Sequence, residues 1–217
     1  MLLLAAYQGD VMRYHELILK EIKYKLPALV AAYAVFVVLF ETGAQRVYSD
    51  IEVLFVFFAM AVSAYLFGSK EEEELIIISK ASLKNVFVIR FLCTYFAFTL
   101  LPAIHVAIRS LDVSAKKAVI LILTTSLFCC ALGAMWRIIL GNAFGALIFS
   151  SISYTALLTP SFITDERIRS IFDSFNPLSG IHINVNSQFY VNRYVTIGIS
   201  LVILLGCYIK LSRSEKV

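Results

Sequence analysis

The chain contains six continuous apolar stretches, and no other feature of the sequence constrains its fold as strongly. A helix needs about 20 mostly apolar residues to cross the roughly 30 Å hydrocarbon core of a bilayer. The stretches cover residues 26–40, 51–67, 86–108, 118–136, 138–158 and 194–211. They are uniformly apolar instead of alternating every second residue, which excludes the pattern of a β-barrel. We therefore predict an all-α membrane protein, a single domain of six transmembrane helices over residues 1–217.

The composition agrees with a lipid environment and excludes an ordinary soluble domain. Apolar residues make up 60% of the 217 residues, and charged residues make up only 16%. Soluble domains average about 25% charged residues. The interior of a soluble protein of this length is too small to bury so many apolar side chains. Disordered and coiled-coil chains are excluded by the same composition.

The segment 10–25 predicts an amphipathic helix that lies at the membrane surface before the first stretch. Its apolar residues recur at three- and four-residue spacing, at Val11, Tyr14, Ile18 and Ile22. Basic residues of the segment fall on the opposite face, where anionic headgroups can contact them. The alternative is a solvated leader whose spacing arises by chance. No cleaved signal is expected, because the first ten residues lack a basic region.

The distribution of basic residues predicts that both termini are cytoplasmic, in a bacterial cell membrane. With that orientation, 12 of the 19 Lys and Arg residues fall on the cytoplasmic side, in agreement with the positive-inside rule. The loop that carries Lys116 and Lys117 is an exception to the rule. Arg193 is also assigned to the external side, at the end of the last polar segment.

The sequence contains no recognisable catalytic or metal-binding motif. Its histidines, His15, His105 and His182, are widely separated, whereas membrane metalloproteases need clustered His and Glu. No phosphate-binding loop of the Gly-x-x-x-x-Gly-Lys-Ser/Thr type is present. All 4 cysteines lie in apolar stretches, where we expect them to pack as small apolar residues. We therefore expect no enzymatic activity, no metal or cofactor in this chain and no nucleic-acid partner.

The most unusual segment, residues 68–85, lies between the second and third stretches. Four consecutive acidic residues run directly into four large apolar residues: Glu71, Glu72, Glu73, Glu74, Leu75, Ile76, Ile77 and Ile78. Acidic residues stabilise the N-terminus of a helix, so residues 70–80 predict a short cytoplasmic helix. Ser82 is then a suitable N-cap for the next helix. The segment is either a solvated connector or a helix that docks in the groove of a cytoplasmic partner.

This arrangement resembles a type-2 ABC transporter permease. The residues that carry the resemblance are Lys70, Glu72, Glu74, Leu75, Ile76, Ser79, Ala81 and Ser82. The resemblance extends over almost the whole chain. It also includes the entry helix, the six spans, the cytoplasmic termini and a long external segment before the last span. Members of that family often carry a proline where this chain has Lys80 and Ala81.

The resemblance implies a partner and a mechanism. The helix over residues 70–80 would be the coupling helix, which docks in a separate ATP-binding subunit that holds ATP and Mg²⁺. A second permease copy or a paralogue would complete the pathway within the lipid bilayer. The pair would work as a bacterial exporter, with amphipathic or antimicrobial peptides or drugs as the expected substrates.

The segment 159–193 is too polar to span and too long for a simple connection. It contains ERIRSIFDSF, whose apolar residues predict a short helix, with Phe172 and Phe175 as candidates for an external gate. The resemblance implies an external re-entrant segment here. The alternative is an interfacial loop helix without a gating role.

Polar residues inside apolar stretches are costly in lipid and are therefore candidates for lining a substrate pathway. The candidates are Thr94, Tyr95, Thr99, Thr125, Ser126 and Tyr154. Alternatively, such side chains bond their own backbone or a neighbouring helix. Gly141 and Gly145 form a Gly-x-x-x-Gly pattern, which suits close helix packing.

No stretch carries a charged residue at its centre, whereas a secondary transporter is expected to hold a charged pair there. This favours an external source of energy. The alternative functions are a stand-alone secondary transporter and an intramembrane enzyme of six helices.

Overall fold

The computed structural model describes residues 82–109, 113–158, 166–178 and 186–214, together with residues 18, 19, 23, 27, 30, 31, 33 and 34. The second expected span, residues 51–67, and the expected coupling helix, residues 70–80, lie outside the described residues. The eight isolated residues belong to the expected interfacial helix and the first expected span, and all eight are helical. The Tyr33 hydroxyl lies 3.1 Å from Nδ1 of His105, which places Tyr33 beside the third expected span.

Three helices are long and apolar enough to cross a membrane within the described part of the chain. They are α4 (Leu83–Arg109), α5 (Val113–Leu140) and α8 (Asn186–Ser214). At a rise of about 1.5 Å per residue, each is about 40 Å long or slightly longer, which exceeds the hydrocarbon core of a bilayer. The structure therefore confirms a helical chain with apolar helices of spanning length, and it describes three of them rather than six.

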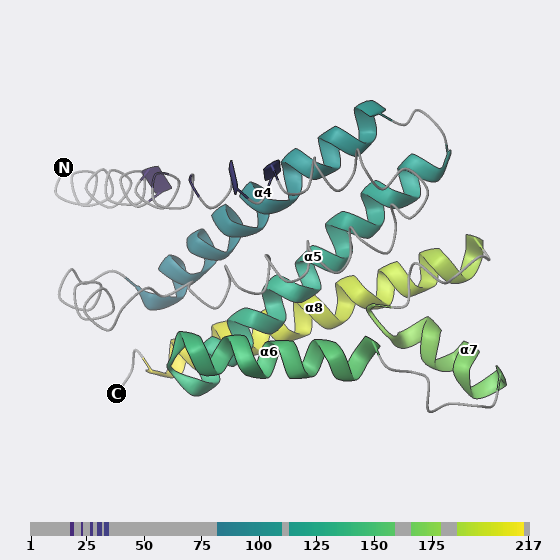
Figure 1. Cartoon of the computed structure of the whole chain (residues 1–217). Helices are drawn as coiled ribbons and strands as arrows, with labels where there is room; N and C mark the ends of the chain where they lie inside the picture. Colours follow the sequence, from purple (N-terminus) through teal and green to yellow (C-terminus); the bar gives the residue numbers. More distant parts are fainter. Residues whose placement is uncertain are drawn as a thin grey trace, which may run out of the picture.

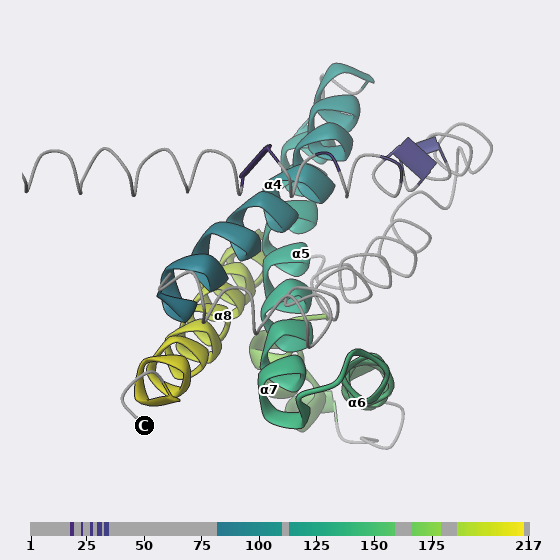
Figure 2. The same ribbon diagram turned by 90° about the vertical axis from the view of Figure 1, so that its left-hand side faces the viewer.

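Helix α5 lies at the centre of the described bundle and packs against α4, α6 (Ala143–Leu158) and α8 (Figure 1 and Figure 2). The short helix α7 (Glu166–Phe175) packs against α8. The C-termini of α4 and α6 and the N-termini of α5 and α8 lie at one end of the bundle, together with α7 (Figure 1). We call this the α7 end. At the opposite end, which we call the α8 C-terminal end, α4 and α6 begin and α5 and α8 end.

The core forms where aromatic residues of α4 meet small and aromatic residues of α5. Phe87 and Phe91 of α4 pack with Phe128, Cys129 and Cys130 of α5 in one buried cluster. Both cysteines are thiols outside any disulfide, and both are fully buried. They act as small apolar residues that let α5 approach its neighbours, in agreement with the role expected from the sequence.

Ser82 marks the start of α4, as the sequence predicts. Its carbonyl oxygen accepts hydrogen bonds from the backbone N–H groups of Asn85 at 3.1 Å and Val86 at 3.0 Å. A residue at the N-cap position makes this pattern, because its carbonyl accepts the first bond of the helix.

The junction between α5 and α6 differs from the expected one. The fifth span was expected over residues 138–158, but Ile138 to Leu140 belong to the last turn of α5. Gly141 ends that helix with a φ of 72°, and its N–H donates to the Arg137 carbonyl at 2.9 Å. Glycine adopts this left-handed conformation without a Cβ clash, which is why it commonly follows the last turn of a helix.

The same junction corrects the expectation that Gly141 and Gly145 serve close helix packing. A Cβ added to Gly141 would meet nothing within 4 Å, so none of the helices that the structure describes approaches this residue closely. Asn142 instead caps α6, because its Oδ1 accepts the Gly145 N–H at 2.6 Å. The two glycines serve a helix–turn–helix junction.

Replacing Gly141 with alanine is expected to destabilise the protein by about 1–2 kcal/mol, because an L-residue is strained in the left-handed conformation. The matched control is Gly198→Ala, which lies in a helix with open space around it; this variant is expected to be neutral or slightly stabilising. Thermal unfolding in detergent can be followed through the fluorescence of Trp136, the only tryptophan of the chain. Equal midpoints for the two variants would contradict the conformational role of Gly141.

Helix α8 also begins earlier than the sequence indicates. The last span was expected over residues 194–211, with residues 186–193 in the external segment, but all of these residues form one helix. The expected boundary followed the last apolar run, and the polar residues Asn192 and Arg193 were excluded from it. The structure buries both side chains within the bundle.

Candidate functional site

Helix α8 carries a buried polar stripe at four-residue spacing. Asn192, Thr196 and Ser200 are all fully buried, and so is Arg193 beside them. The Thr196 hydroxyl donates to the Asn192 carbonyl at 2.8 Å, and the Ser200 hydroxyl donates to the Thr196 carbonyl at 2.7 Å. Polar groups buried in a helix of spanning length are costly and mark functional positions. The end of this stripe that is nearest α7 is the candidate site.

Arg193 joins α8 to α5. Its Nη1 donates to the hydroxyl oxygens of Thr125 at 2.9 Å and Thr124 at 3.1 Å. Its Nε donates to Oδ1 of Asn192 at 3.0 Å. Its Nη2 donates to the Pro177 carbonyl at 3.0 Å, in the segment that follows α7. The guanidinium therefore joins two long helices and the chain beyond α7.

Asn192 caps the end of α7. Its Nδ2 donates to the carbonyl oxygens of Asp173 and Asn176, both at 2.7 Å, and lies 3.3 Å from the carbonyl of Ser174. The last carbonyls of a helix lack partners within the helix. A side chain of α8 thus supplies donors that α7 cannot supply for itself.

Asn176 attaches the same region to α6. Its Nδ2 donates to the Leu157 carbonyl at 2.8 Å, in the last turn of α6. Its Oδ1 accepts the backbone N–H of Leu178 at 3.0 Å, which fixes the turn after α7. Helices α5, α6, α7 and α8 are therefore connected by one buried hydrogen-bond network. We call it the α7 clasp and define it by Thr124, Thr125, Asn176, Asn192 and Arg193.

The electrostatics of the α7 clasp favour the packing of α7 against α8. The C-terminus of a helix carries a partial negative charge, which a nearby cation stabilises. Arg193 supplies that cation, and its guanidinium carbon also lies 5.7 Å from the ring centroid of Phe189, at a distance typical of cation–π contacts. The hydrogen-bond acceptors around Arg193 that are given above are neutral carbonyl, amide and hydroxyl oxygens.

The residues proposed to line a pathway lie at helix contacts in this conformation. Thr94 and Thr99 of α4 and Ser126 of α5 are buried, and Tyr154 of α6 is 8% exposed. The Tyr95 hydroxyl donates to the Leu123 carbonyl of α5 at 3.1 Å. The Thr99 hydroxyl donates to the carbonyl of Tyr95 in its own helix, which is the alternative role that the sequence left open.

Only Thr125 of the pathway candidates belongs to the α7 clasp. Ser126, its neighbour, is 1% exposed, and its hydroxyl has no hydrogen-bond partner among the residues that the structure describes. The two candidates for an external gate have different surroundings. Phe175 is 61% exposed, whereas Phe172 is half-buried.

Asn192 and Arg193 were not among the residues selected from the sequence. A signal was nevertheless present, because Asn192, Thr196 and Ser200 lie at positions i, i+4 and i+8, which places them on one helix face. That periodicity extends the last helix upstream of its apolar run. A window that measures only hydropathy does not detect it.

The resemblance to type-2 ABC permeases stays an expectation from the sequence. In comparisons with known proteins, no family model, curated protein or solved structure matches this chain. The most specific part of the resemblance, the acidic and apolar run over residues 71–78, lies outside the described residues.

Proposed function

We propose that this chain is the membrane-spanning subunit of an ATP-driven ABC exporter. Two permeases would form the substrate pathway, and separate ATPase subunits would bind ATP and Mg²⁺. The observation that carries the proposal is the α7 clasp, in which a buried cation and buried amides hold a short helix against one end of a bundle of spanning helices. This is the arrangement expected of a closed gate, because the polar stripe of α8 leads from the clasp into the bundle.

The charges support a particular orientation of this gate. Over the whole sequence, 12 of the 19 Lys and Arg residues fall on the side of the α8 C-terminal end if both termini lie on that side, although the described helices alone carry five basic residues at this end and six at the α7 end. Under the positive-inside rule the α8 C-terminal end is cytoplasmic, so α7 lies outside a bacterial cell membrane. A gate on that side would have to open for a substrate to leave the cell.

The proposed mechanism separates the motor from the pathway. ATP binding closes the two ATPase subunits, and the helix over residues 70–80 transmits the movement to the permeases. Opening towards the outside then requires α7 and the start of α8 to move away from α5. Every bond of the α7 clasp that crosses between these helices would be replaced by water. Amphipathic or antimicrobial peptides or drugs are the proposed substrates, as the resemblance implies.

The experiment that tests the motor assignment reverses two charges of the acidic run, with Glu72→Lys and Glu74→Lys in one variant. The chain is co-expressed with the ATP-binding-cassette subunit encoded nearest to its gene, and the ratio of the two subunits after purification is measured. Reversed charges at a docking surface weaken binding by several kcal/mol, so we expect the amount of bound ATPase to fall about tenfold or more.

Glu215→Lys in the C-terminal tail is the control for this experiment, because it reverses a charge that is also assigned to the cytoplasmic side. It should leave the ratio unchanged. Undiminished co-purification of the ATPase with the Glu72→Lys, Glu74→Lys variant would show that the docking assignment is wrong.

A stand-alone secondary transporter is the second candidate, and one observation favours it. Arg193 is a charged side chain buried in a helix of spanning length, and such residues often form part of an ion or substrate pathway. Transport by the chain alone in proteoliposomes, driven by an ion gradient and independent of ATP, would establish this function in place of the first.

A further inference from the structure

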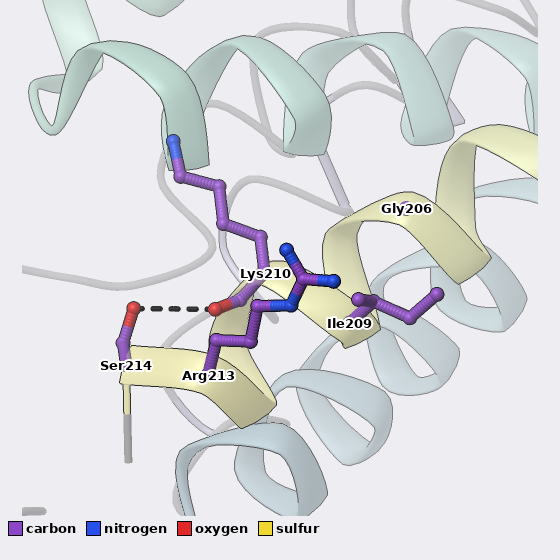
Figure 3. Close-up of a pocket in the computed structure, with 5 residues that line it drawn as sticks. All are labelled: Gly206, Ile209, Lys210, Arg213 and Ser214. Carbon is purple, nitrogen blue, oxygen red and sulfur yellow. Dashed lines mark hydrogen bonds between the residues drawn. The ribbon is translucent and has the colours of Figure 1, made fainter. Parts of the chain in front are cut away.

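A groove of about 410 Å³ lies at the α8 C-terminal end, and its described lining comes from a single face of α8 (Figure 3). The lining residues are Gly206, Ile209, Lys210, Arg213 and Ser214. They lie at three- and four-residue spacing, so they form one strip along the helix. The strip is apolar at Gly206 and Ile209 and cationic at Lys210 and Arg213.

Contacts with α5 and within α8 hold the polar half of the strip in place. Lys210 extends towards α5 (Figure 3), where its Nζ donates to the Ile138 carbonyl at 3.1 Å. The Ser214 hydroxyl donates to the Lys210 carbonyl at 3.2 Å. The Arg213 guanidinium lies beside Ile209, and the Arg213 side chain is exposed. The groove thus offers one fixed cation and one that is free to contact a ligand.

The charge around the groove selects an anion. Arg137, which is buried in the last turn of α5, adds a third positive charge at the same end. In the described ranges, the acidic residues are Glu166 and Asp173, and both belong to α7 at the opposite end of the bundle. Among the residues that the structure describes, no carboxylate lies at this end of the bundle, so an anion in the groove would meet basic side chains.

The apolar half of the strip selects a lipid rather than a soluble anion. Gly206 leaves open space, since an added Cβ would meet nothing within 4 Å. It lies seven residues before Arg213, which is about 10 Å along the helix axis. Both residues belong to the segment Ser187–Ser214, which is long and apolar enough to cross a membrane. An acyl chain can therefore lie over Gly206 and Ile209 while the headgroup phosphate reaches Arg213.

We propose that this groove binds an anionic phospholipid of the cytoplasmic leaflet. Basic pockets at the cytoplasmic ends of spanning helices attract anionic headgroups, and each Lys or Arg contributes enough to change the affinity about fivefold. The proposal does not rest on the transport function. A chain that binds the lipid but transports nothing would leave it unchanged.

The test measures binding of dioleoyl phosphatidylglycerol to the full-length chain in detergent, with dioleoyl phosphatidylcholine as the neutral lipid. Native mass spectrometry gives the occupancy as lipid is added. We expect one saturable phosphatidylglycerol site and at least fivefold weaker binding of phosphatidylcholine. Arg213→Gln removes the exposed cation, and Gly206→Leu fills the apolar half of the groove. Each variant is expected to weaken phosphatidylglycerol binding about fivefold.

Each variant has a matched control outside the groove. Lys116→Gln removes an exposed cation at the opposite end of the bundle, and Gly198→Leu fills open space elsewhere on α8. Both controls should bind phosphatidylglycerol within twofold of the unmodified chain. Because Arg213→Gln alters an exposed side chain, it keeps the test valid should Gly206→Leu impair folding.

Several results would overturn the proposal. Equal affinity for the two lipids, or unchanged binding in both groove variants, would leave only nonspecific lipid contact. Inorganic phosphate that displaces phosphatidylglycerol at equal concentration would identify a phosphate site without a lipid. Binding that appears only after Glu71 to Glu74 are replaced by glutamine would show that the chain's own acidic segment occupies the groove.

Discussion

Replacement of Arg193 with leucine is expected to lower the free energy of unfolding by about 3 kcal/mol. The variant removes the charged donor that Thr125 and the Pro177 carbonyl share. Hydrogen bonds to charged groups contribute about 1.5–3 kcal/mol, and a buried acceptor left without a donor adds a further penalty. For a chain of this size, the loss corresponds to a midpoint lower by about 6–12 °C, which thermal unfolding in detergent will measure.

The control for this variant is Arg213→Leu, at the opposite end of the same helix. Arg213 is exposed, so its replacement is expected to change stability by less than about 0.5 kcal/mol. Arg193→Lys retains the charge but not the several donors of the guanidinium. Its unfolding midpoint should therefore lie between those of Arg193→Leu and Arg213→Leu. If Arg193→Leu and Arg213→Leu unfold at the same temperature, the α7 clasp does not stabilise the fold.

Replacement of Asn192 with leucine is expected to release α7 from the bundle while the long helices stay folded. Leucine is similar in size but cannot donate to the carbonyls of Asp173 and Asn176. Hydrogen exchange of peptides that cover residues 166–178 should therefore become at least about tenfold faster, since each unpaired buried carbonyl costs about 1–3 kcal/mol. Peptides from α5 should keep their protection.

Thr196→Val is the matched control for Asn192→Leu. Thr196 is equally buried on the same stripe, but its hydroxyl donates to a carbonyl of its own helix. Loss of the Thr196 hydroxyl should leave the hydrogen-exchange rate of α7 unchanged. Exchange of α7 in the Asn192 variant as slow as in the unmodified chain would mean that packing against α8, rather than the cap, holds this helix.

The long helices could be predicted from the sequence because continuous apolar runs are sufficient to define them. The run over residues 86–108 became α4, and Ser82 identified its start through cap chemistry. The break between α5 and α6 was misplaced, because Ile138 to Leu140 are as apolar as the residues on either side. The local signal was present in Gly141 and Asn142, a glycine that ends one helix and an amide that caps the next.

The candidate site was harder to predict, because its residues acquire their role only through tertiary contacts. Asn192 and Arg193 are polar and adjoin a polar segment, so hydropathy assigns them to a loop. Their burial depends on acceptors supplied by α5 and by the end of α7, which are distant in the sequence. Thr125 was selected as a polar residue in an apolar run, but its bond to Arg193 depends on the packing of α8 against α5.

The length of α6 has a consequence for the surrounding lipid. This helix has 16 residues, which span about 24 Å, and its exposed face is apolar at Phe144, Ile148 and Ile152. In the proposed orientation this face is shorter than a typical hydrocarbon core of about 30 Å, so the adjoining leaflets have to thin to match it. Of the other described helices, α4, α5 and α8 are all long enough to avoid such a hydrophobic mismatch. We therefore expect the bilayer to be thinner beside α6 than beside these three helices.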